Sequence, residues 1–350
     1  MKKPDIKLLK KICETPGASG FEKEIRKLVI SEVGPVAGKI SVDNLGNVTV
    51  FIKGIKPKKV MLAAHMDEIG FIISHIDENG FLKFHPLGGF DPKTLTAQRV
   101  IVHGKKDIVG VMGSKPIHIM KAEERKKTVE LSDFFIDLGM KKKEVDKYIS
   151  VGDPVTRERE MIELGDCING KSLDNRISVY ILIELIRQLK GVMLPYDLYA
   201  VFTVQEEVGI RGAQVATLEI QPDFGFAVDT TIAYDVPGSS PQETVTKLGE
   251  GAAIKIMDSS AITDVRMVEF MKKTATKHRI KWQPELLPAG GTDTANIQRM
   301  VKSGSITGAV SIPTRHIHQV IESVHKQDVI SAIQLLKNCL MEIDKWNWKF

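Results

Sequence analysis

The fold is indicated first by the segment Val60-Met61-Leu62-Ala63-Ala64-His65-Met66-Asp67-Glu68. Its first five residues form a continuous apolar run, which is expected of a β-strand covered on both faces. The run ends abruptly in a histidine and two acidic residues. The segment therefore predicts a buried strand with polar groups at its carboxyl end.

Three later segments repeat this pattern of an apolar run that ends in polar residues. The carboxyl ends of parallel strands in an open α/β sheet converge on one crevice, where ligands bind. We therefore expect the polar residues that follow the runs to lie close together. The segments are Leu198–Val204, followed by Gln205-Glu206-Glu207; Phe224–Val228, followed by Asp229-Thr230-Thr231; and Gly308–Ile312, followed by Pro313-Thr314-Arg315-His316-Ile317-His318.

Helical patterns alternate with these strands and predict an α/β fold with a mixed, mostly parallel sheet flanked by helices. The residues from Ile177 to Leu189 are apolar nearly all round, so this helix should be buried. Asp174 stands at its start, where backbone donors can help to fix a carboxylate. Other helices are predicted at Asp5–Glu14, after a capping box at Ser19-Gly20-Phe21-Glu22, and around Val329–Ile343, and Val42–Val48 reads as a strand, a turn and a strand.

The pattern changes between Phe71 and Gly165, where short alternating runs surround turn signals such as Asp77-Glu78-Asn79-Gly80. This texture predicts a small β-rich module. We therefore divide the chain into a discontinuous α/β domain, residues 1–70 and 166–350, and an inserted β-rich domain, residues 71–165.

Composition excludes several classes of protein. Lys and Arg number 49 against 44 Asp and Glu, a mild excess spread along the 350 residues, so we expect no nucleic-acid partner. The basic N-terminal segment leads into a broken helical pattern, which argues against a signal peptide. No stretch approaches the roughly 20 apolar residues of a membrane span, so we expect no membrane partner.

Cysteine usage points to the cytoplasm. Cys13, Cys167 and Cys339 are far apart, and no CxxC pair occurs. A disulfide framework or a thiolate zinc site is therefore not expected. A reducing cytosol fits this pattern best, and we predict a cytoplasmic protein.

The polar strand ends predict a metal site. Each residue alone has an ordinary explanation, such as a surface histidine or a helix cap. Several carboxylates and two histidines brought together would be costly to bury unless a cation neutralised them. Imidazole and carboxylate ligands without thiolate suit zinc, cobalt or manganese. Two divalent cations would balance Asp174, Glu207, Asp229 and a hydroxide, so two ions are favoured over one.

Eight short motifs resemble those of the glutamyl and deblocking aminopeptidase family, which includes the tetrahedral aminopeptidases. Each motif is weak alone, but together they follow the family's order over nearly the whole chain. They are Thr15-Pro16-Gly17-Ala18-Ser19-Gly20-Phe21-Glu22, Asp43-Asn44-Leu45-Gly46-Asn47, Ala64-His65-Met66-Asp67-Glu68-Ile69-Gly70-Phe71, Phe135-Ile136-Asp137-Leu138-Gly139, Gly170-Lys171-Ser172-Leu173-Asp174-Asn175-Arg176, Val204-Gln205-Glu206-Glu207-Val208-Gly209, Gly291-Thr292-Asp293 and Ile312-Pro313-Thr314-Arg315-His316-Ile317-His318.

The resemblance implies a two-metal aminopeptidase with a zinc-exopeptidase-like fold. A metal-bridging water would attack the first peptide bond of substrates with a free N-terminus, with Glu206 as general base. Two divalent ions, zinc or cobalt with manganese as a further candidate, would be bound in each subunit. Residues 71–165 would form a dimerisation domain, and dimers would assemble into a tetrahedral dodecamer.

The resemblance also implies individual roles. One ion would be held by His65 and Asp229, and the other by Glu207 and His318, with Asp174 bridging both. Spacing alone cannot choose between His316 and His318, because both face the same way in a strand. The resemblance favours His318.

Asp67 resembles a residue that orients His65. On a strand these two side chains share one face, so Asp67 can accept the other ring N–H of His65 and fix its tautomer. Glu206 and Glu207 are adjacent and should diverge, which leaves one free to handle a proton while the other binds metal.

Three departures from the family pattern lie near the expected substrate pocket. Gln319 follows His318 where a small polar residue is usual, Thr294 replaces alanine after Asp293, and His316 replaces an aromatic residue. The preferred N-terminal residue of the substrate therefore stays open. Two other interpretations remain: a glycoside hydrolase using Glu206 with Asp67 or Asp174, and a non-catalytic assembly protein on the same fold.

Overall fold

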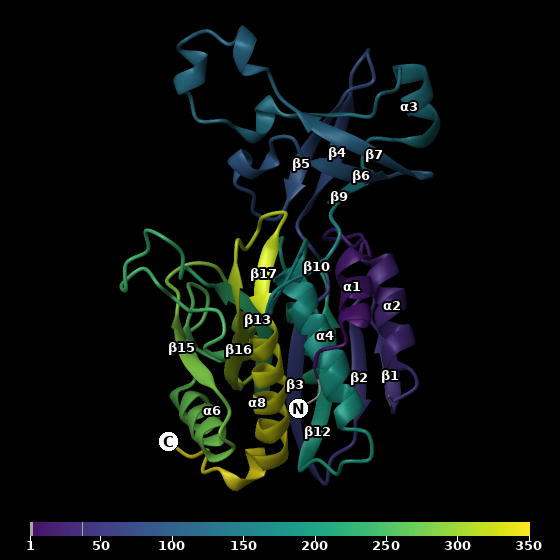
Figure 1. Ribbon diagram of the computed structural model, residues 1–350. Coiled ribbons are helices and arrows are strands. Elements are labelled where there is room, and N and C mark those ends of the chain that lie inside the picture. The colour runs from purple at the N-terminus through teal and green to yellow at the C-terminus, as the bar shows by residue number, and fades with distance from the viewer. Residues whose placement is uncertain (1–2, 37) are drawn as a thin grey trace.

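The computed structural model describes residues 3–36 and 38–350, which form a large α/β unit with a smaller β-barrel at one end (Figure 1). Met1 and Lys2 belong to the basic segment used in the signal-peptide prediction and lie outside the described residues. Within those two ranges, the helices are too short or too polar to cross a membrane.

An 11-stranded mixed sheet runs through the α/β unit. At its centre lie four neighbouring strands, all parallel, in the order β12 (Tyr196–Thr203), β3 (Lys56–His65), β13 (Phe224–Ile232) and β16 (Ile306–Arg315). Each coincides with one of the four predicted apolar runs, because parallel strands covered on both faces need apolar residues on both. The predicted α/β class with a mixed, mostly parallel sheet is confirmed.

Further strands extend this centre on both sides. They are β1 (Lys39–Val42), β2 (Val48–Ile52), β10 (Ile162–Leu164), β11 (Cys167–Gly170), β14 (Ala252–Met257), β15 (Trp282–Leu286) and β17 (Glu322–His325). On one side β2 pairs antiparallel with β12, and β1 follows in the predicted strand–turn–strand arrangement. On the other side β17, β11 and β10 follow β16 in antiparallel order, while β14 also pairs with β16 and carries β15.

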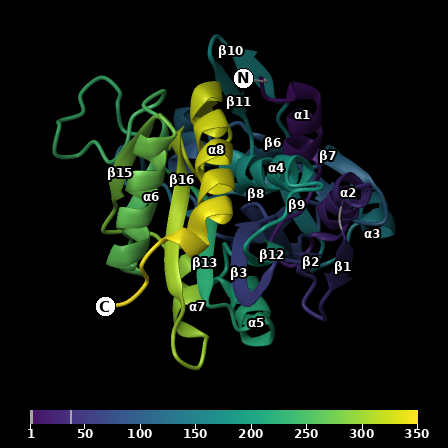
Figure 2. The same cartoon turned by 90° about the horizontal axis from the view of Figure 1, so that it is seen from below.

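Helices cover both faces of the sheet (Figure 2). One face packs against α1 (Ile6–Glu14), α2 (Lys23–Val33), α4 (Leu173–Gln188), α6 (Val265–Lys277) and α8 (Lys326–Glu342), which a short 3-10 turn, η5 (Ile343–Lys345), follows. The other face carries α5 (Arg211–Ile220) and α7 (Thr294–Arg299).

The side chains of β3 divide between these two layers. Leu62 and Ala64 belong to the core under α1, α2 and α4, whereas Met61 and Ala63 pack with residues of α5 and α7. This alternation is the period-2 geometry of a strand. The prediction of a buried helix after Leu173 is also confirmed, since every side chain of α4 as far as Ile183 is buried.

The capping box predicted before α2 is wrong. The helix begins at Lys23, and its N-cap residue Glu22 makes no capping hydrogen bond. The Ser19 hydroxyl instead donates to Asp67 Oδ2 at 2.6 Å, and Glu22 Oε1 accepts the amide N–H groups of Gly20 and Gln205. Both side chains bind the loops that follow β3 and β12, so neither is available to cap the helix.

A closed six-stranded barrel forms the second unit and has its own apolar core. Its strands, all paired antiparallel, are β4 (Gly70–Ile76), β5 (Leu82–Leu87), β6 (Arg99–His103), β7 (Asp107–Gly113), β8 (Phe135–Asp137) and β9 (Pro154–Arg157). It also contains α3 (Lys142–Tyr148) and the 3-10 turns η1 (Pro92–Leu95), η2 (Ile117–Ile119), η3 (Glu124–Lys126) and η4 (Leu131–Asp133). The β-rich insertion is therefore a separate barrel, while its boundaries at 71 and 165 and its role in dimerisation stay predictions.

Candidate metal centre

The carboxyl ends of the four central strands open into a cavity of about 450 Å³. The register explains this convergence: Thr203 pairs with His65, and Asp229 pairs with Ser311, so neighbouring strands end at the same level. The barrel contributes Gly89 to the cavity wall. All five predicted metal ligands and Glu206 line this cavity.

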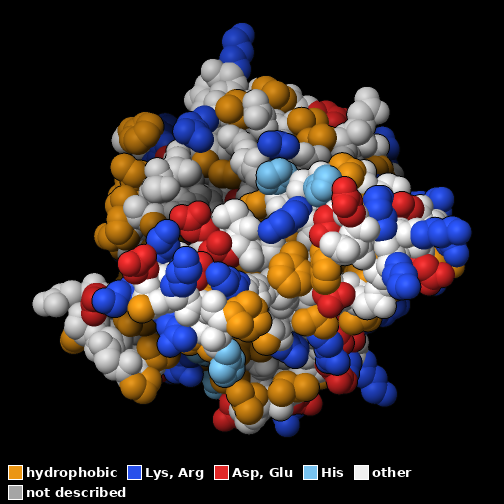
Figure 3. Space-filling model, turned by 90° about the horizontal axis from the view of Figure 1, so that it is seen from above, with side chains coloured by type: hydrophobic (Ala, Val, Ile, Leu, Met, Phe, Trp, Pro, Cys, Tyr) orange, Lys and Arg blue, Asp and Glu red, His pale blue; other side chains and the backbone are white. Residues whose placement is uncertain are grey.

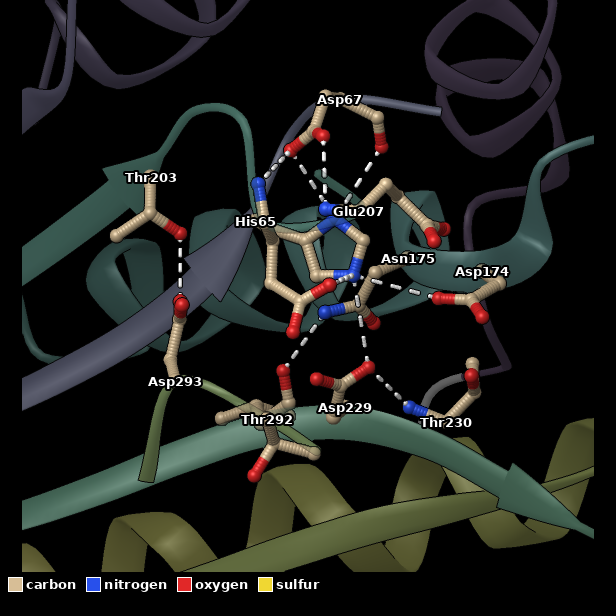
Figure 4. A network of polar contacts seen from close by, with 12 residues as sticks. His65, Asp67, Asp174, Asn175, Thr203, Glu207, Asp229, Thr230, Thr292 and Asp293 are labelled. Atoms are coloured by element: carbon tan, nitrogen blue, oxygen red, sulfur yellow. Dashed lines mark hydrogen bonds and ion pairs between the residues drawn. The ribbon is translucent and has the colours of Figure 1, made fainter. Parts of the chain in front are cut away.

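His65, Asp174 and Asp229 form the first group of residues that could hold a metal ion. Nε2 of His65 lies 3.4 Å from Oδ1 of Asp174 and 3.7 Å from Oδ1 of Asp229. The three side chains are buried, come from separate elements and point toward one another in Figure 4. Their donor atoms all lie within 4.8 Å of one another, which is close enough for one cation to contact all three.

Asp174, Glu207 and His318 form a second such group. Nε2 of His318 lies 3.3 Å from Oδ2 of Asp174 and 3.5 Å from Oε2 of Glu207. The ring is oriented from its other side, since Nδ1 lies 3.0 Å from the carbonyl oxygen of Gly89. Asp174 is the member that both groups share, with one carboxylate oxygen facing each.

The donor set fits cations rather than further hydrogen bonding. Oδ1 of Asp174 and Oε1 of Glu207 are buried and have no hydrogen-bond donor among the described residues. A buried carboxylate oxygen without a partner is costly, and a bound cation removes that cost. Imidazole and carboxylate ligands without thiolate suit zinc, cobalt or manganese.

The charges of the residues in both groups also favour a bound cation. Burial lowers the pKa of His65, but its close contacts with the Asp174 and Asp229 carboxylates raise it well above its usual value. Burial also opposes the charged form of His318, yet Asp174 and Glu207 raise its pKa to about 10. Burial, followed by the charge of Asp174, raises the pKa of Glu207 to about 8. At this site the carboxylates therefore lack enough neighbouring positive charge to balance them.

Asp67 joins His65 to the loop that carries the two glutamates. Nδ1 of His65 lies 3.2 Å from the main-chain oxygen of Asp67 and 3.3 Å from its Oδ1. The Asp67 carboxylate also accepts the amide N–H groups of Glu206 and Glu207, at 3.0 and 3.2 Å. Asp67 thus links the end of β3 to the end of β12.

The strand geometry predicted for His65 and Asp67 is wrong. β3 ends at His65, so the shared face of a strand does not explain the contact with Asp67. The same holds for His316 and His318, which follow the end of β16 in a turn with positive φ values of 60° and 59°. Left-handed backbone breaks the period-2 rule, and only the ring of His318 reaches the carboxylates.

The expected helix-terminus support of Asp174 is also wrong. Asp174 and Asn175 have non-helical backbone angles at the start of α4. Among the hydrogen bonds of the described residues, no main-chain N–H donates to the Asp174 carboxylate. Its oxygens are left to face the two histidines.

Glu206 lies beside the first group but belongs to neither. Its Oε2 is 3.8 Å from Nε2 of His65, and its side chain is 10% exposed. Burial raises the pKa of Glu206 well above its usual value. Within the described residues, Glu206 is thus a carboxylate beside the first group that could hold a metal ion and a member of neither group.

Two buried acids near the site received no role from the sequence. Asp293, in the quoted Gly291-Thr292-Asp293 motif, accepts a hydrogen bond from Thr203 Oγ1 at 2.6 Å, and burial raises its pKa to about 7. Glu322 accepts the amide N–H groups of Asp174 and His318. Glu322 lies four residues after His318, but in a turn this spacing does not predict that two residues are in contact.

Lys255 supplies a buried positive charge in the cavity wall. Its Nζ lies 3.1 Å from Asp258 Oδ2 and 3.0 Å from Glu285 Oε1, and all three side chains are almost fully buried. Burial opposes the ammonium charge, but Glu285 and Asp258 raise the pKa of Lys255. This cation is fully paired inside the protein.

We expect Lys255→Met to lower the free energy of unfolding by about 3–5 kcal/mol, because Asp258 and Glu285 would stay buried without their cation. The exposed pair of Lys142 and Asp146 provides a matched control, since Lys142→Met should change stability by less than about 1 kcal/mol. Urea unfolding followed by tryptophan fluorescence would report on the α/β unit, which contains Trp282, Trp346 and Trp348. Equal stability of the two variants would contradict the prediction.

Comparisons with known proteins agree with the geometry. The profile of the M42 glutamyl aminopeptidase family matches residues 46–335. The lysyl aminopeptidase of Pyrococcus furiosus is 35% identical over 348 residues, covering 97% of each chain. These matches identify the chain as a peptide hydrolase.

Two solved structures have the same fold. The TET1 peptidase of Pyrococcus horikoshii, which can assemble into a tetrahedron or a large octahedral shell, superposes with a TM-score of 0.88 at 32% identity, covering 96% of this chain and 99% of that one. A structure from Thermotoga maritima described as an endoglucanase has a TM-score of 0.79 at 29% identity, covering 95% and 96%. With most of its length matched by the family profile, the chain belongs to the M42 glutamyl aminopeptidase family.

Proposed function

We propose that this protein is a two-metal aminopeptidase that removes the N-terminal residue from peptides. The observation that carries the proposal is the pair of ligand groups that share Asp174. A single structural ion would need only one such group. The same cavity also holds Glu206, a carboxylate that neither group uses.

The ligands of the proposed centre follow from the two groups. His65 and Asp229 would hold one ion, Glu207 and His318 the other, and Asp174 both. Zinc or cobalt suits this donor set best, with manganese as a further candidate. When bound, two such ions would supply Lewis acidity that polarises a scissile carbonyl and lowers the pKa of an attacking water.

We assign the proton transfers of the reaction to Glu206. Placed next to the first group, it would take a proton from the attacking water and later give it to the leaving amine, acting first as general base and then as general acid. Asp67 would act indirectly by positioning other residues, because it contacts His65 and accepts the amide N–H groups of Glu206 and Glu207. An acidic cavity also favours the free α-amino group of a peptide.

Assembly is the second part of the proposal. We infer that the barrel mediates dimerisation and that the dimers build a tetrahedral dodecamer. The TET1 peptidase of Pyrococcus horikoshii can assemble into a tetrahedron, and the barrel of this chain carries exposed apolar side chains. Figure 3, which views the barrel end, shows hydrophobic side chains interspersed with charges of both signs. The exposed apolar residues include Val109, Val111, Ile117 and Ile119.

Metal removal tests the proposed activity. Dialysis against a chelator should lower release of the N-terminal residue by at least about 10²-fold, because the metal contribution is worth several kcal/mol and 1.36 kcal/mol is tenfold. Zinc or cobalt should restore activity, with two ions bound per chain. The measurement uses a panel of aminoacyl substrates with acidic, aliphatic and basic residues, together with metal analysis.

The same experiment separates the rival functions. A glycoside hydrolase would cleave a β-glucan through two carboxylates and would keep its activity in the chelator. The endoglucanase description of the Thermotoga maritima structure makes a β-glucan the appropriate second substrate. A purified protein that binds no metal and cleaves neither substrate would support the non-catalytic alternative.

A further inference from the structure

Glu322 connects the two segments that carry Asp174 and His318. It stands at the start of β17 and its side chain is fully buried. Oε2 accepts the amide N–H of Asp174 at 2.9 Å, and Oε1 accepts the amide N–H of His318 at 3.0 Å. One carboxylate thus ties together two backbone positions that are far apart in the sequence.

Both of these amides lie where regular secondary structure supplies no main-chain acceptor. Asp174 lies in the first turn of α4, where N–H groups have no partner within the helix. His318 has a φ of +59°, a left-handed conformation that non-glycine residues seldom adopt. A fixed acceptor holds each backbone in the conformation that aims its side chain at the cavity.

The two side chains held in this way are neighbours in the second ligand group. Oδ2 of Asp174 and Nε2 of His318 are 3.3 Å apart. The third member, Glu207, is held separately through the Asp67 carboxylate. Glu322 therefore controls the separation of two ligands in the second group, whereas His65 and Asp229 of the first group depend on other contacts.

A buried arginine stabilises the same turn. Arg157, at the end of barrel strand β9, is 1% exposed, and its Nη1 donates to the main-chain oxygen of Gln319 at 2.5 Å. The Glu322 carboxylate offers one acceptor oxygen to each N–H group, whereas an amide in its place would turn its own NH₂ toward one of them.

We propose that Glu322 is a positioning residue that sets the affinity of the second metal site through the backbones of Asp174 and His318. The inference rests on the proposed two-metal function. Glu322 does not contact the substrate cavity, so its effect reaches catalysis only through the ligands it holds. Contacts of this kind behind metal ligands typically change metal affinity by about 10- to 100-fold.

The test compares Glu322→Gln with Glu342→Gln, a matched change in an ion pair of Glu342 with Lys277 that is remote from the cavity. Zinc binding to each variant would be measured by competition with a chromogenic chelator, which gives an affinity for each of the two ions. We expect Glu322→Gln to weaken the binding of one ion by about 10- to 100-fold while the affinity of the other changes much less. Excess zinc should restore most of kcat, and KM should change little. Glu342→Gln should resemble the wild type.

Glu322→Asp covers the case in which Glu322→Gln does not fold. Aspartate keeps the charge but is one carbon shorter, so it cannot reach both amides, and we expect an intermediate loss of affinity. If the folded variants bind both ions as tightly as the wild type, or lose both equally, the inference is overturned. If wild-type protein itself binds fewer than two ions, the proposed function fails instead.

Discussion

Glu206→Gln should lower kcat by about 10²- to 10⁴-fold while leaving two metal ions bound, because general acid–base catalysis contributes a factor of this size. Glutamine fills the same space but cannot accept the proton of the attacking water. Glu206 belongs to neither ligand group, and its Oε2 lies 3.8 Å from the His65 ring, so metal binding should survive the change. The rate of N-terminal residue release and the metal content would be measured on the same preparation.

Two outcomes would argue against this role. A near-normal kcat would remove Glu206 from proton transfer, and loss of an ion would make it a ligand instead. Glu144→Gln is a suitable control, since Glu144 is an exposed residue on the barrel helix α3 and should leave kcat unchanged.

Asp174→Asn should reduce both metal binding and activity. Asp174 is the residue shared by the two ligand groups, with Oδ1 facing His65 and Oδ2 facing His318. Asparagine offers one oxygen and one NH₂ group, so it can act as a ligand toward one ion only. We expect at least one ion to be lost and kcat/KM to fall by about 10³-fold, since several kcal/mol of metal assistance would be removed.

Asp229→Asn gives the informative comparison for Asp174→Asn. Asp229 belongs only to the first group, so its replacement should weaken one ion and spare the other. Asp146→Asn, at an exposed position of α3, controls for the change of charge. Equal metal affinities in the Asp174 and Asp229 variants would show that the bridging assignment is incorrect. Metal content measured by elemental analysis and kcat/KM together decide between these outcomes.

Much of the fold was predictable because burial leaves a local signature. A parallel strand with helices on both faces needs a continuous apolar run, and β3, β12, β13 and β16 each have one. The position of the site followed from the same fact, since the carboxyl ends of such strands open into one crevice. The sequence alone therefore predicts that His65, Glu206, Glu207 and Asp229 lie close together.

Predictions based on neighbouring residues were wrong where the backbone is neither helix nor strand. Three predictions assumed a periodic backbone that is absent at those positions. The α2 helix begins only at Lys23, β3 already ends at His65, and α4 is non-helical at Asp174. His316 and His318 could not be distinguished for the same reason. Positive φ angles in the turn after β16 expose one ring and direct the other toward the carboxylates.

The sequence by itself determined the α/β class, the polar strand ends and the acidic and histidine-containing character of the site. These properties depend on residues that are close in the chain, so they can be read from periodicity and composition. Only the tertiary structure decided that Asp174 faces both groups, that Glu322 holds Asp174 and His318, and that Arg157 of the barrel supports the same turn. The Asp174–Glu322 and Arg157–Gln319 contacts join segments 148 and 162 residues apart. Buried amide and carboxylate groups find such partners through three-dimensional packing, which no local pattern encodes.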